Sequence, residues 1–299
     1  MELTLDFKKK IATALVEARN NYGGSEAHFA STKGLSAAQY SRLKNGQIDQ
    51  LLSPTAWIAL ARQLDVTLSK RTHKIVRTEV YNEIEESIKF CQEFHKSIIL
   101  VDETGIGKTA CAKHICSKLK NAFYIDCSQA KSRIQFMKLL ARTLGIETAL
   151  KSRGNRYIDI KENVKYTLAN ILQNPIIILD EAGDLDYASF LDIKELWNAS
   201  EDACGWFMMG ADGLRNKIET GMKYNRVGFA ELFSRFSDEY ISIIPTVEED
   251  RKAFYNQMIL DIVKANGDVA KAAQYARACV SKGKSLRHLD TLLKLDANG

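Results

Sequence analysis

The sequence is poor in proline, in histidine and in long apolar segments. Three prolines and five histidines occur in 299 residues, so Pro-rich linkers and a histidine metal cluster are not expected. No apolar run approaches the roughly 18 residues of a membrane helix, and the N-terminal MELTLDFKKK lacks the apolar core of a signal peptide. The six cysteines are scattered without a C-x-x-C pair. We therefore expect a cytoplasmic protein with reduced cysteines in its core and no membrane contact.

The remaining composition is that of an ordinary globular chain with a small excess of positive charge. The hydrophobic share is 45 % and the charged share is 26 %, and the length is sufficient for two domains and a large core. Lysine and arginine number 42 against 37 acidic residues, which gives a net charge of +5. This balance allows nucleic-acid binding without requiring it.

A phosphate-binding loop is predicted at residues 97–109, SIILVDETGIGKT. An apolar run ends there in a loop that carries two glycines, and a helical pattern follows. The pattern is nearly G-x-x-x-x-G-K-[ST], but Asp102 stands where the first glycine belongs. In such a loop backbone N–H groups point at phosphate oxygens, the lysine meets the β- and γ-phosphates, and the hydroxyl ligates Mg²⁺. The expected nucleotide-binding residues are Thr104, Gly105, Ile106, Gly107, Lys108 and Thr109.

A second motif, IIILDE at residues 176–181, supplies acidic groups. Its apolar residues predict a buried strand that ends in Asp180 and Glu181. We expect this strand to lie beside the P-loop strand, with Asp180 holding Mg²⁺ through water and Glu181 polarising the attacking water. Strand and helix patterns alternate through residues 96–245. This alternation predicts an α/β core, a doubly wound parallel sheet whose ligand lies at the carboxyl edge.

Residues 1–70 predict an all-α domain that contains a helix-turn-helix. In SEAHFASTKGLSAAQYSRLKNG a small residue precedes Gly34 by four positions, and Ser36 can cap the helix that follows. This segment resembles the helix-turn-helix domains of phage repressors. The contacts to bases and phosphate that the resemblance implies would come from Gln39, Arg42 and Lys44. A solvated helix face and a protein-docking module are the alternatives.

The rest of the chain predicts a linker, a last strand and a helical lid. Residues 71–95 form a basic linker and a helix, and 246–299 form a lid of three helices. A strand is expected at Ile241–Ile244. Arg235 follows an apolar helix end, where an arginine can reach the nucleotide of a neighbouring subunit, although the residues alone favour a surface arginine in a salt bridge. Arg287 points away from the apolar face of the last helix and can reach a γ-phosphate. Asp212 is the polar sensor candidate after the strand at 205–210.

Together these motifs resemble those of AAA+ ATPases. More narrowly, they resemble the ATPases that select target DNA in transposition, which are the B protein of Mu-like transposing phages and the helper ATPases of insertion sequences. The resemblance spans nearly the whole chain and is carried by ETGIGKT at 103–109, IIILDEAGDL at 176–185, MMGAD at 208–212, FAELFSRF at 229–236 and GKSLRHL at 283–289. It implies that Arg235 is a trans-acting arginine finger and that Arg287 is a lid sensor.

The resemblance implies an ATP- and Mg²⁺-dependent ATPase that forms a ring or helical filament on double-stranded DNA with little sequence preference. It further implies that the protein delivers this DNA to a transposase and stimulates strand transfer. Basic residues of the core would bind the DNA, and the candidates are Lys151, Arg153 and Arg156, followed by Lys217, Lys223 and Arg226. Exposed loop charge is the alternative for both sets. A nucleotide-switched transcriptional regulator and an AAA+ helper that acts on proteins are the other functions that fit.

Overall fold

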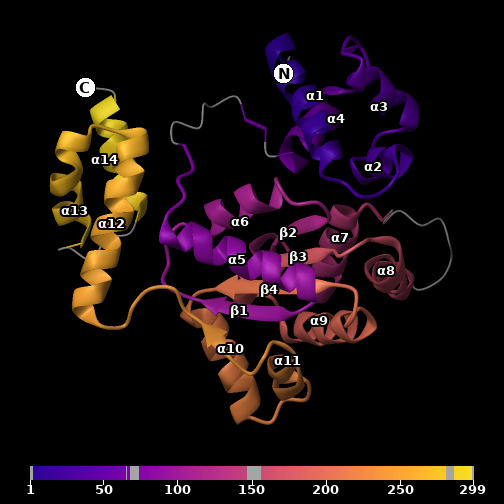
Figure 1. The fold of residues 1–299 in the computed structure, drawn as a ribbon. Coiled ribbons are helices and arrows are strands. Elements are labelled where there is room, and N and C mark those ends of the chain that lie inside the picture. Colours follow the sequence, from indigo (N-terminus) through magenta and orange to yellow (C-terminus); the bar gives the residue numbers. More distant parts are fainter. Residues whose placement is uncertain (1–2, 65, 68–73, 147–155, 281–285, 298–299) are drawn as a thin grey trace.

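The computed structural model describes the chain except for residues 1–2, 65, 68–73, 147–155, 281–285 and 298–299 (Figure 1). Four helices come first: α1 (Leu5–Asn20), α2 (Glu26–Thr32), α3 (Ala37–Lys44) and α4 (Pro54–Gln63). The sheet region contains α5 (Glu79–Phe94), β1 (Ser97–Val101), α6 (Lys108–Cys116), β2 (Ala122–Asp126), α7 (Arg133–Leu144), α8 (Arg156–Tyr166), β3 (Ile176–Asp180), α9 (Tyr187–Ala199), β4 (Gly205–Gly210), α10 (Asp212–Lys223), α11 (Phe229–Arg235) and β5 (Tyr240–Ile241). The last helices are α12 (Glu248–Asn266), α13 (Ala272–Val280) and α14 (Leu286–Ala297).

The five strands form one sheet in the order β2-β3-β4-β1-β5, and every pairing is parallel. This confirms the predicted parallel α/β core. The prediction that the strand ending in Asp180 lies beside the P-loop strand is wrong, because β4 lies between β3 and β1. All six residues of β4, GWFMMG, are buried. A strand that is apolar on both faces is most stable at the centre of such a sheet.

Alternate side chains of each strand enter two separate hydrophobic clusters. Ile177 and Leu179 belong to the cluster built with α7, α8 and α9. Ile176 and Ile178 belong to the cluster built with α5 and α6. Successive side chains of a strand point to opposite faces, so one apolar run covers both layers. Figure 1 shows α5 and α6 over one face of the sheet. Among the described residues, none of the helices combines the length and apolar character that crossing a bilayer demands.

The first four helices surround their own hydrophobic cluster, which includes Phe29, Tyr40 and Trp57. The turn between α2 and α3 has Gly34 at φ 69°, a left-handed conformation that glycine adopts easily. Ser36 and Gln39 form a capping box at the start of α3. The six cysteines are all thiols outside any disulfide, and all are buried except Cys116, which is half-buried.

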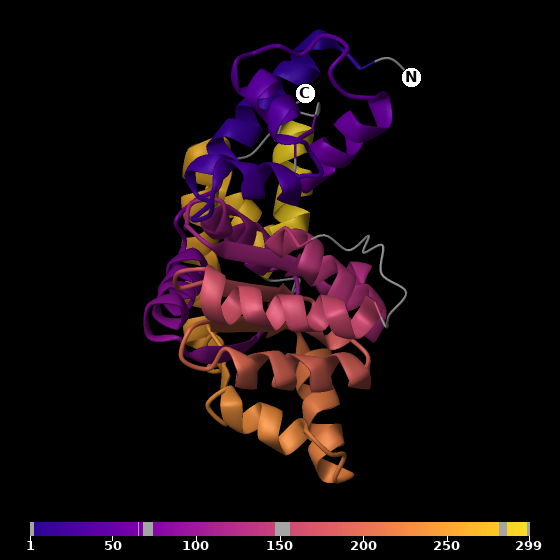
Figure 2. The same cartoon turned by 90° about the vertical axis from the view of Figure 1, so that its right-hand side faces the viewer.

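Asn121 joins the N-terminal helices to the sheet region. Its backbone N–H donates to the carbonyl of Asn21 at 3.1 Å, and its side-chain oxygen accepts from the N–H of Gly23 at 2.9 Å. Its side-chain NH₂ donates to the carbonyl of Gln173 at 2.7 Å. This buried side chain therefore ties the segment after α1 to the loops before β2 and β3. Figures 1 and 2 show the N-terminal helices above the sheet and the α10–α11 hairpin projecting from the opposite side.

Candidate nucleotide site

The predicted P-loop connects β1 to the N-terminus of α6. Gly105 and Gly107 have φ values of 78° and 100°, which a side chain would strain. Gly107 is the N-cap of α6 and Lys108 is the first residue of that helix. Thr109 follows and is exposed. The helix N-terminus and the curled loop together form the environment that attracts phosphate.

Lys108 is buried, and its ammonium contacts the loop itself. Its Nζ donates to the carbonyl oxygens of Asp102 at 2.8 Å and Glu103 at 2.6 Å. Burial lowers the pKa of Lys108, and the carboxylates of Asp102, Glu181, Asp180 and Glu103 oppose that shift. The ammonium is therefore poorly solvated, which strengthens its attraction for a phosphate, while the neighbouring carboxylates partly offset that attraction.

Asp102, the residue that breaks the P-loop pattern, anchors the loop. Its Oδ2 accepts hydrogen bonds from the backbone N–H groups of Ile243 at 2.6 Å and Ile244 at 3.0 Å, and from the hydroxyl of Ser242 at 3.2 Å. Its Oδ1 accepts from the N–H of Glu103 at 2.7 Å. The predicted strand Ile241–Ile244 is therefore wrong beyond Ile241. These N–H groups bind a carboxylate and leave the sheet ladder.

Asp180 ends β3 and Glu181 follows it at the carboxyl edge of the sheet, as predicted. Asp180 is 2 % exposed, and its Oδ1 accepts from the N–H of Glu181 at 2.9 Å. Glu181 adopts φ 50°, which turns the chain sharply after the strand. Burial raises the pKa of Glu181, the Asp180 carboxylate adds to the rise, and Lys108 opposes it. A carboxylate with a raised pKa is suited to accept a proton from water.

A hydroxyl that the sequence analysis missed orients Asp180. Tyr124 on β2 donates its phenolic proton to Asp180 Oδ2 at 2.5 Å. Each carboxylate oxygen of Asp180 thus accepts one hydrogen bond and keeps a further lone pair. Oxygen donors of this kind suit Mg²⁺, which prefers carboxylates and water. The residues present fit the ion, which Asp180 and the Thr109 hydroxyl would hold together with water.

The C-terminal helices reach the P-loop at two points. The N–H of Leu286, the first residue of α14, donates to the carbonyl of Gly105 at 3.1 Å. On α12, Arg251 pairs with Glu103 at 2.8 Å, and the hydroxyl of Tyr255 donates to the same carboxylate at 2.8 Å. Arg287 follows Leu286 and is exposed, which places it beside the loop. The five residues before Leu286, which include the start of the GKSLRHL segment, lie outside the described residues.

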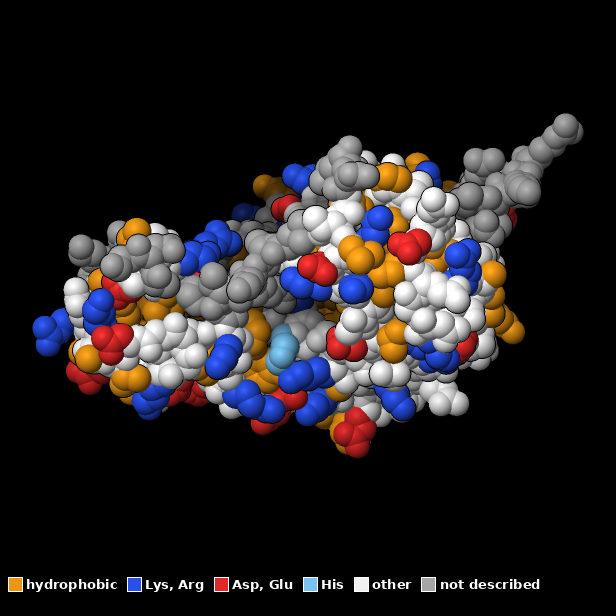
Figure 3. All heavy atoms as spheres, turned by 90° about the horizontal axis from the view of Figure 1, so that it is seen from above, with side chains coloured by type: hydrophobic (Ala, Val, Ile, Leu, Met, Phe, Trp, Pro, Cys, Tyr) orange, Lys and Arg blue, Asp and Glu red, His pale blue; other side chains and the backbone are white. Residues whose placement is uncertain are grey.

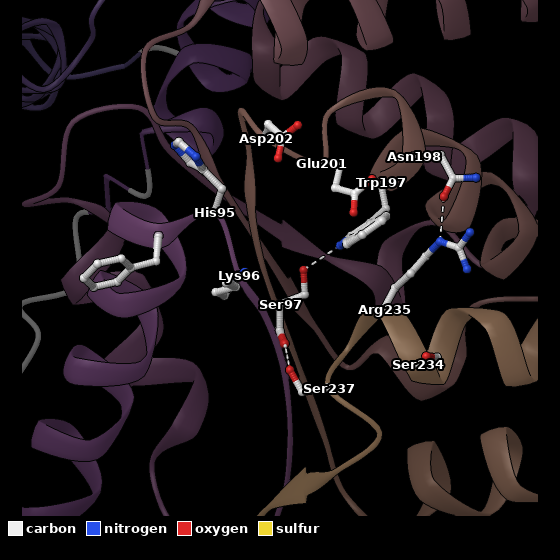
Figure 4. A pocket seen from close by; sticks show the side chains of 11 residues that line it. His95, Lys96, Ser97, Trp197, Asn198, Glu201, Asp202, Ser234, Arg235 and Ser237 are labelled. Carbon is white, nitrogen blue, oxygen red and sulfur yellow. Dashed lines mark hydrogen bonds between the residues drawn. The ribbon is translucent and has the colours of Figure 1, made fainter.

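Arg235 lies at the other end of β1. With Ser97, the first residue of that strand, it lines a hollow of about 510 Å³ (Figure 4). Its Nε donates to Asn198 Oδ1 at 2.6 Å, a terminal nitrogen donates to the carbonyl of Glu231 at 2.8 Å, and the guanidinium lies 5.4 Å from the Trp197 ring centroid. Five strand residues separate this end from the P-loop, roughly 16 Å. Arg235 therefore does not join Lys108, Asp180 and Glu181.

The sequence could have suggested some of the contacts that it did not reveal. Tyr124 lies two residues before the end of β2, the strand that pairs with β3, so a hydroxyl near Asp180 follows once the strand order is known. Glu103 is different, because its partners Arg251 and Tyr255 lie far along the chain on α12. No local pattern marks that contact. Asp212, the sensor candidate, is exposed at the start of α10.

The predicted DNA-binding residues of α3 are partly engaged. The side-chain oxygen of Gln39 accepts from the N–H of Ser36 at 2.9 Å, and Lys44 pairs with Glu26 at 2.6 Å. Arg42 is exposed, with a bond of 3.3 Å to Gln47. Figure 3 shows the face that carries these helices and the C-terminal helices, and its Lys and Arg side chains are spread among Asp and Glu.

The two sets of core candidates have different outcomes. Lys151 and Arg153 lie outside the described residues, and Arg156 begins α8 with a side chain that also lies outside them. Lys217 is unsuited to DNA, because its ammonium donates to the carbonyls of Gly183 and Leu185. Lys223 and Arg226 are both exposed.

These features define a P-loop nucleotide-binding domain with a five-stranded parallel sheet. Residues 91–218 match the family model described as "AAA domain", so the chain contains an AAA-type P-loop ATPase domain, and its core has the AAA+ α/β fold. No curated protein matches the chain. Among solved structures, the Orc1 protein of Aeropyrum pernix, in complex with DNA, aligns at a TM-score of 0.44 and 12 % identity. The alignment covers 72 % of this chain and 62 % of that chain, so this chain spans less than two thirds of it.

Proposed function

We propose that this protein is an ATPase that, in the presence of ATP, assembles on double-stranded DNA with little sequence preference. It then delivers that DNA to a partner transposase. Lys108 and the P-loop N–H groups bind the phosphates, Asp180 and Thr109 hold Mg²⁺, and Glu181 accepts a proton from the attacking water. When bound, the Mg²⁺ ion neutralises charge on the transferred phosphate. Arg287 contacts the γ-phosphate from the lid side.

The observation that carries the proposal is the distance of Arg235 from its own P-loop. Because β1 separates the two, Arg235 can complete a nucleotide site only in a second copy of the chain, which supports a homo-oligomeric ring or filament. Transposition itself is supported by the motif resemblance, above all LFSRF at 232–236 and GKSLRHL at 283–289. The excess of positive charge agrees with a polyanionic partner.

The experiment is retention of random-sequence duplex DNA by the full-length protein with ATP, with ADP and without nucleotide, repeated across salt concentrations. We expect retention with ATP alone, falling steeply as salt rises. Addition of a transposase encoded beside this chain should then increase strand transfer into the retained DNA. DNA retention that is the same with and without ATP would contradict the proposal.

A nucleotide-switched transcriptional regulator is the second candidate. One observation favours it: α3 has a capped N-terminus and exposes Arg42, as a recognition helix requires. The same retention experiment separates the two, because a regulator would bind one short sequence far more tightly than random DNA.

A further inference from the structure

The end of α10 and the loop to α11, residues 223–228, lie at a projecting end of the molecule (Figures 1 and 2). Two apolar side chains of this segment are exposed to solvent. Val227 is 71 % exposed and Tyr224 is 67 % exposed, the highest values among the large hydrophobic side chains of the described residues. We call this segment, KYNRVG, the tip loop. Exposed apolar side chains gathered at one projecting end are typical of interaction sites.

Contacts with the first residues of α9 and α11 hold the tip loop in place. Phe229 is 3 % exposed and stacks on Tyr187 with the ring centroids 5.5 Å apart. The hydroxyl of Tyr187 donates to the carbonyl of Val227 at 2.6 Å. Gly221 and Gly228 leave no room for a side chain, since an added Cβ would lie 2.4 Å from Phe229 and from Leu191 respectively. The exposed side chains are therefore presented on a fixed loop, which lowers the entropy lost on binding.

The tip loop carries two cations, of which Lys223 lies beside Tyr224 and Arg226 precedes Val227 in the sequence. Lys223 Nζ lies 5.9 Å from the Tyr224 ring centroid, and the Arg226 guanidinium lies 5.9 Å from that of Tyr187. The six residues of the tip loop contain no acidic side chain. Glu219 on α10 and Glu231 on α11 are exposed nearer the base of the hairpin. Two exposed apolar side chains and two cations within six residues complement a polyanion whose backbone surrounds an apolar stack of bases.

We propose that the tip loop is a wedge for double-stranded DNA, in which Tyr224 and Val227 insert against a base step and Lys223 and Arg226 hold the phosphates on either side. A duplex fits better than a single strand, because a single strand needs a row of aromatic side chains along a groove, whereas the tip loop offers one aromatic ring. This inference rests on the proposed function and names the part of the protein that distorts the DNA.

The experiment uses the full-length protein with ATP and a random-sequence duplex that contains the fluorescent base aminopurine. Tyr224→Ala should lower the affinity about tenfold, because stacking on a base is lost. It should also abolish the rise in aminopurine fluorescence that reports unstacking, and the dependence of affinity on salt should not change. Val227→Ala should act in the same direction. Tyr166→Ala, at a tyrosine 62 % exposed on α8, is the matched control and should leave both readouts unchanged.

Substitution of the cations, Lys223 and Arg226, should change the salt dependence of binding and leave base unstacking intact. Lys223→Gln should reduce the slope of log affinity against log salt by about 0.9 and weaken binding while the aminopurine signal of the bound complex persists. Because all of these side chains are exposed, nucleotide affinity and Tm should remain those of the wild type.

Three results would overturn the wedge. In the first, Tyr224→Ala binds and unstacks DNA like the wild type. In the second, DNA binding is intact but the variant fails to assemble with other copies, which would assign the tip loop to a protein interface. In the third, the wild-type protein does not bind DNA at all. That result would reject the proposed function as well, whereas the first two leave it intact.

Discussion

The two ends of strand β1 hold their polar groups in different ways. At the carboxyl end, Lys108, Asp102 and Glu103 bond to one another and to distant segments of the same chain. At the amino end, Arg235 rests on Asn198 and Trp197 at the rim of an open hollow. The first end can bind a ligand with its own groups. The second presents a cation that has no phosphate-binding partner in its own subunit.

The two proposed DNA surfaces differ in a similar way. The α3 helix lies among the N-terminal helices, and the tip loop lies on the opposite side of the sheet region (Figures 1 and 2). A straight duplex that contacts one surface therefore leaves the other free in the same subunit. On a filament, we expect the tip loop to contact the central duplex and α3 to contact a second DNA segment or a protein.

The largest effect is expected at the amino end of β1. Arg235→Ala should lower ATP hydrolysis by the assembled protein about a thousandfold, because an arginine finger stabilises the charge of the transition state. Nucleotide affinity of the isolated chain should not change, since Arg235 lies away from its own P-loop. Steady-state hydrolysis and binding of a fluorescent ATP analogue measure the two quantities. Arg142→Ala, at an exposed arginine on α7, is the control.

Mixing variants tests whether the finger acts in trans. Arg235→Ala keeps an intact P-loop, and Lys108→Ala keeps an intact finger. A mixture should therefore hydrolyse ATP faster than either variant alone. Hydrolysis by Arg235→Ala at the wild-type rate would show that this arginine is an ordinary surface residue and would remove the contrast between the two ends.

The next effect is expected at the carboxyl end. Lys108→Ala should weaken ATP binding about a hundredfold, near 2.7 kcal/mol, because the cation that meets the phosphates is lost. The fold should persist, since burial already lowers the pKa of this ammonium and so opposes its charge in the folded state. Titration of a fluorescent ATP analogue measures the affinity, with Lys118→Ala on the exposed surface after α6 as the control. Equal affinity in the Lys108 variant would place the nucleotide elsewhere.

Asp102 gives a prediction that opposes the sequence pattern. Asp102→Gly restores the usual P-loop glycine, yet it should lower the free energy of unfolding by about 2 kcal/mol, because the N–H groups of Ile243 and Ile244 lose their acceptor. Asp102→Asn retains one oxygen acceptor and should lose roughly half as much. Urea denaturation measures both variants. A glycine variant as stable as the wild type would mean that the anchor between the P-loop and the segment after β5 contributes little.

The sequence predicted the local parts of the site and missed the contacts between distant segments. The P-loop and the acids after β3 lie at strand ends, so an apolar run followed by a few polar residues was enough to locate them. The strand order was harder to predict, because an apolar run such as GWFMMG would be buried at any position in the sheet. The run carries no information about which strands pair with it. The role of Asp102 was hidden for a related reason. Two of its partners are the backbone N–H groups of Ile243 and Ile244, which every residue type except proline could supply.

The smallest effect is expected at Tyr124, and it tests how tightly the carboxyl end is organised. Tyr124→Phe removes the hydroxyl that binds Asp180 Oδ2, so the carboxylate should turn more freely and hold Mg²⁺ less well. We expect the Mg²⁺ concentration for half-maximal nucleotide binding to rise about fivefold, near 1 kcal/mol, while nucleotide affinity without Mg²⁺ stays the same. Tyr187→Phe is the matched control, because it removes one tyrosine hydroxyl bond at the tip loop. An equal loss of nucleotide affinity with and without Mg²⁺ would mean that Tyr124 has a general structural role and does not position Asp180 for the ion.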